Sequence, residues 1–255
     1  SSDWSADVCS SDLVDWGEYG TVPVGRTKRR LSFFLMVLCF SRMLFVRFTL
    51  GQGMEHFLQC HKEAFEYFDG VPQRIMVDNL KCAVLRRNVG QAPVFNPRYA
   101  DFARHYDFGI SACNVGKGNE KGRVENGVRY IKGNLLRGLE ITKYELLPPL
   151  AERWMREEAN VRIHGTTQRR PVDLFAEEKE RLNPLPHIPG STSRLQAARS
   201  NNRFRVAFDG NRYSVPYRHA SKALRIYVYA DELYIYDGSL LLARHARSYD
   251  RNQDI

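Results

Sequence analysis

The sequence predicts a mixed α/β domain built in layers, followed by a helical segment and a small β-rich unit. Near-continuous apolar and β-branched runs between residues 31 and 50 are typical of strands covered on both faces. Apolar stripes at helical spacing separate the later strands of the first domain. From residue 203 onward, apolar side chains instead recur at every second position, which is the period of half-buried strands.

The first strands are expected early in the chain. Residues 14–19 (VDWGEY) are predicted to form a short strand, and a gap of basic and turn residues follows, ending at Arg29 and Arg30. Residues 31–40 and 43–50 then form two longer strands. Because only two residues separate these runs, they are predicted to pair as an antiparallel hairpin.

Helices and strands alternate after this hairpin. A helix is predicted from residue 54, with Gly70 as its C-terminal stop, and residues 74–78 (RIMVD) form a short strand that ends on a carboxylate. Asn96 and Pro97 are typical of a second helix start. Residues 109–115 (GISACNV) are a fifth strand, and a loop at 116–119 leads to a helix from about 120 to 137. This order matches a ribonuclease-H-like domain, with a mixed five-stranded sheet and flanking helices.

The chain divides into four predicted parts. Residues 1–12 have no periodicity and look like a translated sequencing adapter, so they are interpreted as a non-native extension of an N-terminally truncated chain. Residues 13–140 are the ribonuclease-H-like core, and 141–195 are a helical segment (144–162) and a linker, marked by Arg170-Pro171 and prolines at 183–189. Residues 196–255 are predicted to form a small basic β-barrel, with hairpin turns at Asp209-Gly210 and Asp237-Gly238.

Composition narrows the function. The chain has 38 lysines and arginines against 29 aspartates and glutamates, a net charge of +9, which favours a polyanionic partner such as nucleic acid. Its five cysteines are scattered and never form a C-x-x-C pair, which argues against a disulfide framework and a structural zinc site. The longest apolar run is too short to cross a bilayer, and no secretory signal is visible. We therefore expect a cytoplasmic protein with no membrane partner.

Three carboxylates stand where a catalytic metal site would need them. Asp15 lies within the first strand, Asp78 ends the fourth, and Glu125 lies near the start of the last helix. Strands one and four can be neighbours in such a sheet, so the two aspartates can face each other. Clustered carboxylates repel unless cations bind between them, and oxygen ligands favour magnesium or manganese. The alternative is that these acids are solvated, cap helices or form turns.

The last predicted helix also carries a row of cations. Lys121, Arg129 and Lys132 share a face with Glu125, and an apolar stripe ending at Ile131 and Leu135 would dock on the sheet. The cations would hold DNA phosphates beside a metal-binding acid. The alternative is an exposed helix face with ordinary ion pairs four residues apart.

Three segments resemble the core of IstA-type bacterial insertion-sequence transposases, which belong to the transposase and retroviral integrase superfamily. These segments are VDWGEY, IMVDN and GKGNEKGRVENGVRYIK. The resemblance covers roughly residues 13–175, and its most specific part is K-G-x-V-E at 121–125. It implies that Asp15, Asp78 and Glu125 are a DDE triad holding two magnesium or manganese ions. It also matches Arg129 and Lys132 to positions that contact DNA.

The same resemblance implies metal-dependent DNA cleavage and strand transfer in integration and transposition. The expected partners are DNA (the element ends and the target), further copies of the chain in a multimer on DNA, and a separate ATP-binding helper, since no P-loop is present. The expected location is the bacterial cytoplasm, on the nucleoid when bound to DNA. Two alternatives stay open: an inactive DNA-binding remnant of a transposase, or a nuclease of the same fold that cuts without joining.

Further DNA contacts are predicted outside the core. Arg162 and His164 lie in a segment, residues 160–175, that also resembles the family, although His164 suits a hydrogen-bonded structural role equally well. In the C-terminal unit, a basic and aromatic strand face could grip the DNA backbone or simply be a solvated surface. Its members are Arg203, Arg205, Arg225, Tyr227 and Tyr229.

Overall fold

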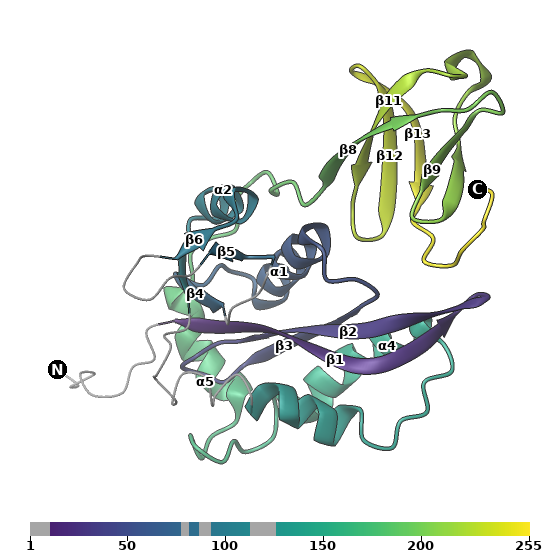
Figure 1. The fold of residues 1–255 in the computed structure, drawn as a ribbon. Coiled ribbons are helices and arrows are strands. Elements are labelled where there is room, and N and C mark those ends of the chain that lie inside the picture. Colours follow the sequence, from purple (N-terminus) through teal and green to yellow (C-terminus); the bar gives the residue numbers. More distant parts are fainter. Residues whose placement is uncertain (1–10, 78–81, 87–92, 113–125) are drawn as a thin grey trace.

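A computed structural model describes residues 11–77, 82–86, 93–112 and 126–255. Over these residues the chain forms a sheet with helices on both faces and a smaller β-rich unit, joined by an extended linker (Figure 1). Asp78, Lys121 and Glu125 lie outside the described residues.

The larger unit is built on a mixed five-stranded sheet in the order β3-β2-β1-β4-β7. The first three strands are antiparallel, and β4 and β7 run parallel to β1. This is the ribonuclease-H-like arrangement that the sequence predicts. The strands are β1 (Asp12–Val24), β2 (Thr27–Val37), β3 (Leu44–Thr49), β4 (Arg74–Val77) and β7 (Gly109–Ala112), with a separate small hairpin of β5 (Val84–Arg86) and β6 (Val94–Phe95).

The basic gap expected after residue 19 is wrong, because these residues are the tip of a long hairpin. β1 continues to Val24 and β2 begins at Thr27, with Gly25 at φ 56° in the turn between them. Residues near the tip alternate between exposed and half-buried side chains. Such a strand carries few apolar residues, so the hydrophobic pattern did not reveal it.

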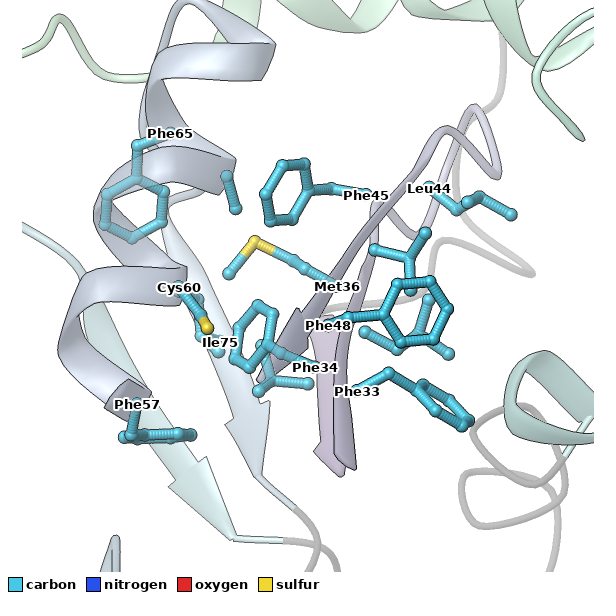
Figure 2. Packing of buried hydrophobic residues seen from close by; sticks show 14 of the residues in the cluster. Phe33, Phe34, Met36, Leu44, Phe45, Phe48, Phe57, Cys60, Phe65 and Ile75 are labelled. Carbon is cyan, nitrogen blue, oxygen red and sulfur yellow. The ribbon is translucent and has the colours of Figure 1, made fainter. Parts of the chain in front are cut away.

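Two helices cover one face of the sheet, α1 (Met54–Phe68) and α2 (Pro97–Tyr106). Phe34 of β2 packs edge-to-face against Phe57 of α1, while Phe33 points to the opposite face (Figure 2). The expected cap of α2 is confirmed, because the Asn96 side chain accepts the Arg98 N–H. α1 ends one residue earlier than expected, with Asp69 rather than Gly70 in the left-handed conformation.

The opposite face is covered by the later helices (Figure 1). The predicted helical segment at 144–162 is confirmed in outline by η2 (Tyr144–Leu146), α4 (Leu147–Trp154) and η3 (Met155–Ala159). Arg170-Pro171, predicted to mark a linker, instead begins a further helix, because proline is well tolerated in a first helical turn. This helix is α5 (Pro171–Glu178), followed by η4 (Lys179–Arg181).

The C-terminal unit is all antiparallel. Its strands form a four-stranded sheet in the order β13-β12-β11-β8 and a separate hairpin of β9 and β10, so their pairing shows no closed barrel. Side chains of both sheets, including Val206, Tyr213, Ile226 and Ile235, make its core. The elements are β8 (Arg194–Arg199), β9 (Arg205–Phe208), β10 (Asn211–Ser214), η5 (Tyr217–His219), β11 (Ala223–Val228), β12 (Glu232–Asp237) and β13 (Leu240–Ala246).

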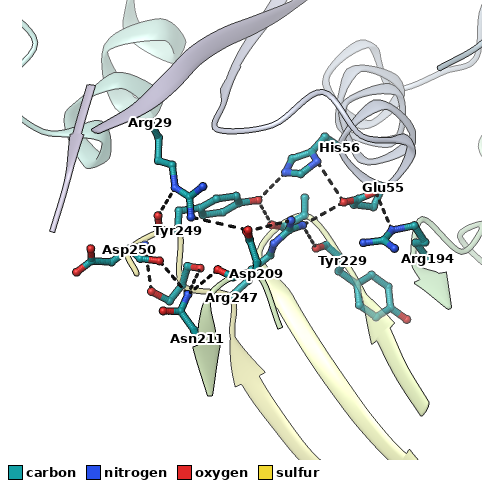
Figure 3. Close-up of polar contacts among 12 residues, drawn as sticks. Arg29, Glu55, His56, Arg194, Asp209, Asn211, Tyr229, Arg247, Tyr249 and Asp250 are labelled. Carbon is teal, nitrogen blue, oxygen red and sulfur yellow. Dashed lines mark hydrogen bonds and ion pairs between the residues drawn. The ribbon is translucent and has the colours of Figure 1, made fainter. Parts of the chain in front are cut away.

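A buried polar network joins the two units (Figure 3). Arg247 donates to Glu55 at the start of α1 over 3.2 Å, and Arg194 lies 3.6 Å from the same carboxylate. His56 contacts the hydroxyl of Tyr249 at 2.5 Å. Arg29 near the hairpin tip donates to the Tyr249 carbonyl. The β-rich unit is thus held against the start of α1 and the tip of the β1–β2 hairpin.

The cysteines differ in part from expectation. Cys60 and Cys82 carry free thiols, whereas Cys39 is disulfide-bonded, a bond that the argument against a disulfide framework did not anticipate. No helix within the described ranges is long and apolar enough to cross a bilayer.

Candidate functional site

Asp15 lies in the middle of the sheet on β1, with a half-buried side chain whose Oδ1 accepts the Trp16 N–H over 2.7 Å. Asp15 pairs with Leu35 and Trp16 with Phe34 across the antiparallel ladder. Paired residues point to the same face of a sheet, and neighbours along a strand point to opposite faces. Since Trp16 and Phe34 contact Phe57 of α1, Asp15 and Leu35 face away from α1.

The parallel pairing of β1 with β4 leads towards the second predicted acid. Its register joins Asp12 to Ile75, Leu13 to Met76 and Val14 to Val77, the last residue of β4. The described ladder therefore ends one residue before Asp15 on one strand and one residue before Asp78 in the sequence.

The helix that follows Glu125 crosses the face to which Asp15 points. Residues 126–130 are helical and continue into η1 (Ile131–Leu135). A Cβ at Gly127 would lie 2.7 Å from Leu35 Cδ2, so the start of this helix packs on the cross-strand partner of Asp15. At its other end, the Tyr19 hydroxyl donates to the Leu136 carbonyl over 3.0 Å. Both ends of the helix are thereby fixed against β1 and β2.

Gly17, which the sequence patterns did not single out, lies beside Asp15 on β1. It lies two positions from Asp15 on the same face, and a Cβ there would stand 1.9 Å from the tip of the Phe33 ring. Only glycine lets this ring lie across β1 beside Asp15. A glycine inside a strand is a signal of such close approach, but its partner cannot be read from sequence.

The predicted cations lie on and beside the same helix. Arg129 and Lys132 are exposed, and Arg129 donates to Asn126. Ile131 and Leu135 are buried, as the apolar stripe predicts. The guanidinium of Arg162 stacks over the ring of Tyr130, and its Nη1 donates to the Ala159 carbonyl over 3.0 Å. Arg162 is therefore brought to the helix after Glu125, although it lies more than thirty residues later.

His164 has a local role. Its Nδ1 accepts the Thr166 N–H over 3.2 Å, which fits the structural interpretation. Burial lowers its pKa, and the nearby charges of Arg162 and Arg42 lower it further. These surroundings therefore favour the neutral form of the ring.

The other two predicted DNA contacts, Arg203 and Arg205, belong to the β-rich unit. Arg203 is exposed, whereas Arg205 is paired with Asp254, which also lies 3.8 Å from Arg212. The positive charge of Arg205 is thus partly compensated. Among the described residues, no cluster of three His, Cys, Asp or Glu side chains could hold a metal ion. Two of the three predicted ligands lie outside those residues.

Comparison with known proteins identifies the family. The integrase core domain family matches residues 4–117, and the family described as Mu transposase, C-terminal domain, matches residues 185–255. The transposase for insertion sequence element IS21 of Pseudomonas aeruginosa is 34% identical over 91% of this chain and 59% of its own length. The chain belongs to the IS21 family of insertion-sequence transposases.

A second curated protein is similar to most of this IS21-family chain. A putative transposase for insertion sequence element IS5376 of Geobacillus stearothermophilus is 32% identical over 84% of this chain and 52% of its own length. The chain spans only a little over half the length of these curated relatives. The HTLV-2 integrase catalytic core domain, solved in complex with magnesium, is similar with a TM-score of 0.45 at 14% identity, over 64% of this chain and 94% of that one.

Proposed function

We propose that this chain performs DNA strand cleavage and strand transfer, with Asp15, Asp78 and Glu125 as its catalytic carboxylates. The main support for this proposal is the position of Asp15. It points to the face of the five-stranded sheet that the helix after Glu125 crosses. One further step of the β1–β4 register would pair Asp15 with Asp78, which directly follows Val77. The packing of Gly127 on Leu35 supports a place for Glu125 near the same point.

The residues fit a divalent metal ion. All three proposed ligands are carboxylates, and Asp15 sits half-buried on a sheet, where its orientation is fixed by the Trp16 N–H. Two magnesium or manganese ions held there would supply activation of the attacking oxygen and stabilisation of the leaving oxygen. The carboxylates would also relieve their mutual repulsion through this binding, which keeps them ionised.

Other side chains would position the DNA. Lys121, Arg129 and Lys132 would contact phosphates next to the carboxylates, with Arg162 held beside them on the Tyr130 ring. Arg203 and Arg205 would extend this contact to the β-rich unit. The Phe33 ring, which lies over Gly17, would limit water on one side of Asp15. The DNA would be the element ends and the target.

The assembly is a further part of the proposal. The net charge of +9 favours long polyanions. A multimer of this chain on DNA and a separately encoded ATP-binding helper would complete the reaction, as the family resemblance implies.

The test uses a supercoiled plasmid and a labelled duplex with a free 3′-hydroxyl end, each incubated with the chain and magnesium. Nicking reports cleavage, and transfer of label to the plasmid reports joining. Asp15→Asn is expected to abolish both, because it removes a ligand charge with little change in shape. Glu18→Gln is the matched control, since Glu18 is an exposed acid on the same strand paired with Arg30.

Each other outcome has a distinct meaning. Cleavage without joining would replace the proposal with a nuclease, and DNA binding without either activity would indicate an inactive remnant. Full activity of Asp15→Asn, or equal loss in Glu18→Gln, would show that the carboxylate assignment is wrong.

A further inference from the structure

The four-stranded sheet of the C-terminal unit has one face that points away from the β9–β10 hairpin. Leu224, Ile226 and Ile235 are buried on the face towards the β9–β10 hairpin. The residues that alternate with them point the other way. On that side, Tyr227 pairs with Tyr234, and Arg225 pairs with Tyr236.

Tyrosine rings occupy the centre of this face. The rings of Tyr227 and Tyr236 meet edge-to-face with centroids 5.2 Å apart. Tyr234 lies under the guanidinium of Arg244, which pairs with it from β13 at 5.2 Å from the ring centre. All three rings are only half-buried. Aromatic surface therefore remains available in the middle of the sheet.

Arginines surround these rings. Arg199 and Arg225 are exposed, and no ion pair joins either of them to a carboxylate within the described residues. Arg244 is paired with Glu232 at the start of β12. Arg199 and Arg225 thus add to the aromatic rings of this face a positive charge that no local carboxylate of the described residues compensates.

We propose that this tyrosine–arginine face (Arg199, Arg225, Tyr227, Tyr234, Tyr236 and Arg244) binds unpaired nucleotides of a DNA strand. Bases would stack on the tyrosine rings, and the arginines would hold the phosphates. This nucleotide-binding proposal rests on the proposed function in one respect, because both require that DNA is the substrate. It assigns to the β-rich unit a preference for strand regions that have opened, rather than for duplex.

The chemistry of the face favours single strands over duplex DNA. In a duplex, each base has its two faces covered by its neighbours, so only unpaired bases can stack on a protein ring. Duplex recognition relies on phosphate contacts and groove edges, for which arginines suffice and rings add little. A centre of three tyrosines is thus better explained by unpaired bases.

The experiment measures the anisotropy of a fluorescein-labelled oligo(dT) with the full chain in EDTA. Tyr227→Leu is expected to weaken binding about tenfold, because it removes stacking but keeps an apolar side chain. Tyr227→Phe keeps the ring and should bind within about twofold of the unchanged chain. Tyr217→Leu is the matched control, since Tyr217 is 64% exposed in η5 and lies outside this face.

Two further measurements complete the test. A duplex of the same length should compete poorly with oligo(dT), and Arg225→Gln should lower the salt dependence of binding by about one phosphate contact. Thermal unfolding of each variant shows that it folds. Because no metal is needed, the result is independent of cleavage: a chain that cannot cut DNA can still confirm stacking, and an active chain can still refute it.

Equal oligo(dT) affinity in Tyr227→Leu and the unchanged chain would overturn the proposal, as would tighter binding to duplex than to oligo(dT). If Tyr227→Leu instead alters sedimentation with no change in affinity, the face contacts a second copy of the chain, and the nucleotide proposal is likewise rejected.

Discussion

The guanidinium carbon of Arg162 lies 3.8 Å from the centre of the Tyr130 ring. This contact links the segment after η3 to the helix that follows Glu125. Arg162→Gln is expected to lower the free energy of unfolding by about 1 kcal/mol. Urea denaturation of Arg162→Gln, Tyr130→Leu and the double variant checks this. The two single losses should not add, because each removes the same contact; strictly additive losses would contradict a direct interaction.

Asn160 protects the outer edge of the sheet. Its side chain accepts the Leu44 N–H and donates to the Leu44 carbonyl, both over 2.9 Å, much as a neighbouring strand would. Asn160 is only 2% exposed, so its loss leaves both backbone groups buried and unpaired. Asn160→Ala should lower the free energy of unfolding by about 2–3 kcal/mol, measured in urea. Asn202→Ala, at an exposed position, is the control and should change stability little.

Glu55 holds the two units together through Arg247 and Arg194. Burial would raise the pKa of Glu55, but a backbone hydrogen bond and the two arginines outweigh it and hold the pKa below its ordinary value. The ion pairs of Glu55 with the two arginines therefore stabilise the fold at pH values above the ordinary pKa of glutamate. This stabilisation is lost as the pH falls through the lowered pKa of Glu55. Glu55→Gln should cost about 3 kcal/mol at pH 7, since it leaves buried arginine charge unpaired.

Limited proteolysis gives a second measurement of the same contact. In Glu55→Gln, cleavage within residues 183–193, the linker between the units, should become faster as the β-rich unit loosens. Glu66→Gln changes an acid of the same helix whose side chain is 53% exposed, and it should leave cleavage unchanged. Equal protection of the linker in Glu55→Gln would show that this network does not hold the units together.

Two buried histidines should make stability depend on pH. Burial lowers the pKa of His61 to about 3, and burial together with Arg247 lowers that of His56 to about 4. Both rings stay neutral while the unfolded chain takes up protons below pH 6.5. The contribution of the two neutral histidines to the free energy of unfolding is therefore fully present above pH 6.5 and falls towards pH 4. The loss between pH 7 and pH 5 is about 2 kcal/mol for each histidine.

Urea denaturation at pH 7 and pH 5 checks this expectation. His61 donates to the Phe57 carbonyl and contacts the Tyr99 hydroxyl, so His61→Gln keeps a polar group there but removes the titration. The loss between the two pH values should shrink in this variant. His187→Gln removes an exposed histidine of the linker and serves as control. An identical pH dependence in His61→Gln and the unchanged chain would contradict a neutral buried ring.

The sequence predicts those features that depend on local patterns. The Asn96 cap, the stripe ending at Ile131 and Leu135, and the order of strands and helices along the chain all follow from spacing and residue type. The hairpin tip at Thr27 escaped prediction because its alternating charged residues do not resemble a buried strand. The contact of Gly17 with Phe33 and that of Glu55 with Arg247 join distant segments, and no local pattern carries that information. For Asp15, Asp78 and Glu125, the sequence supplies the residue types and their places near strand and helix ends. That the three carboxylates lie close together stays a prediction.

The contact between Arg29 and the Tyr249 carbonyl spans 220 residues. During synthesis, the first hairpin leaves the ribosome long before the segment that clasps its tip has been made. The sheet can therefore assemble early, from strands that are neighbours along the chain. The tip of the β1–β2 hairpin gains its contact with Tyr249 only after the final residues have been made. Closure of this contact is expected to be the last event of folding, so a nascent chain halted before residue 249 would expose the Arg29 side chain, which is only 18% exposed in the finished protein.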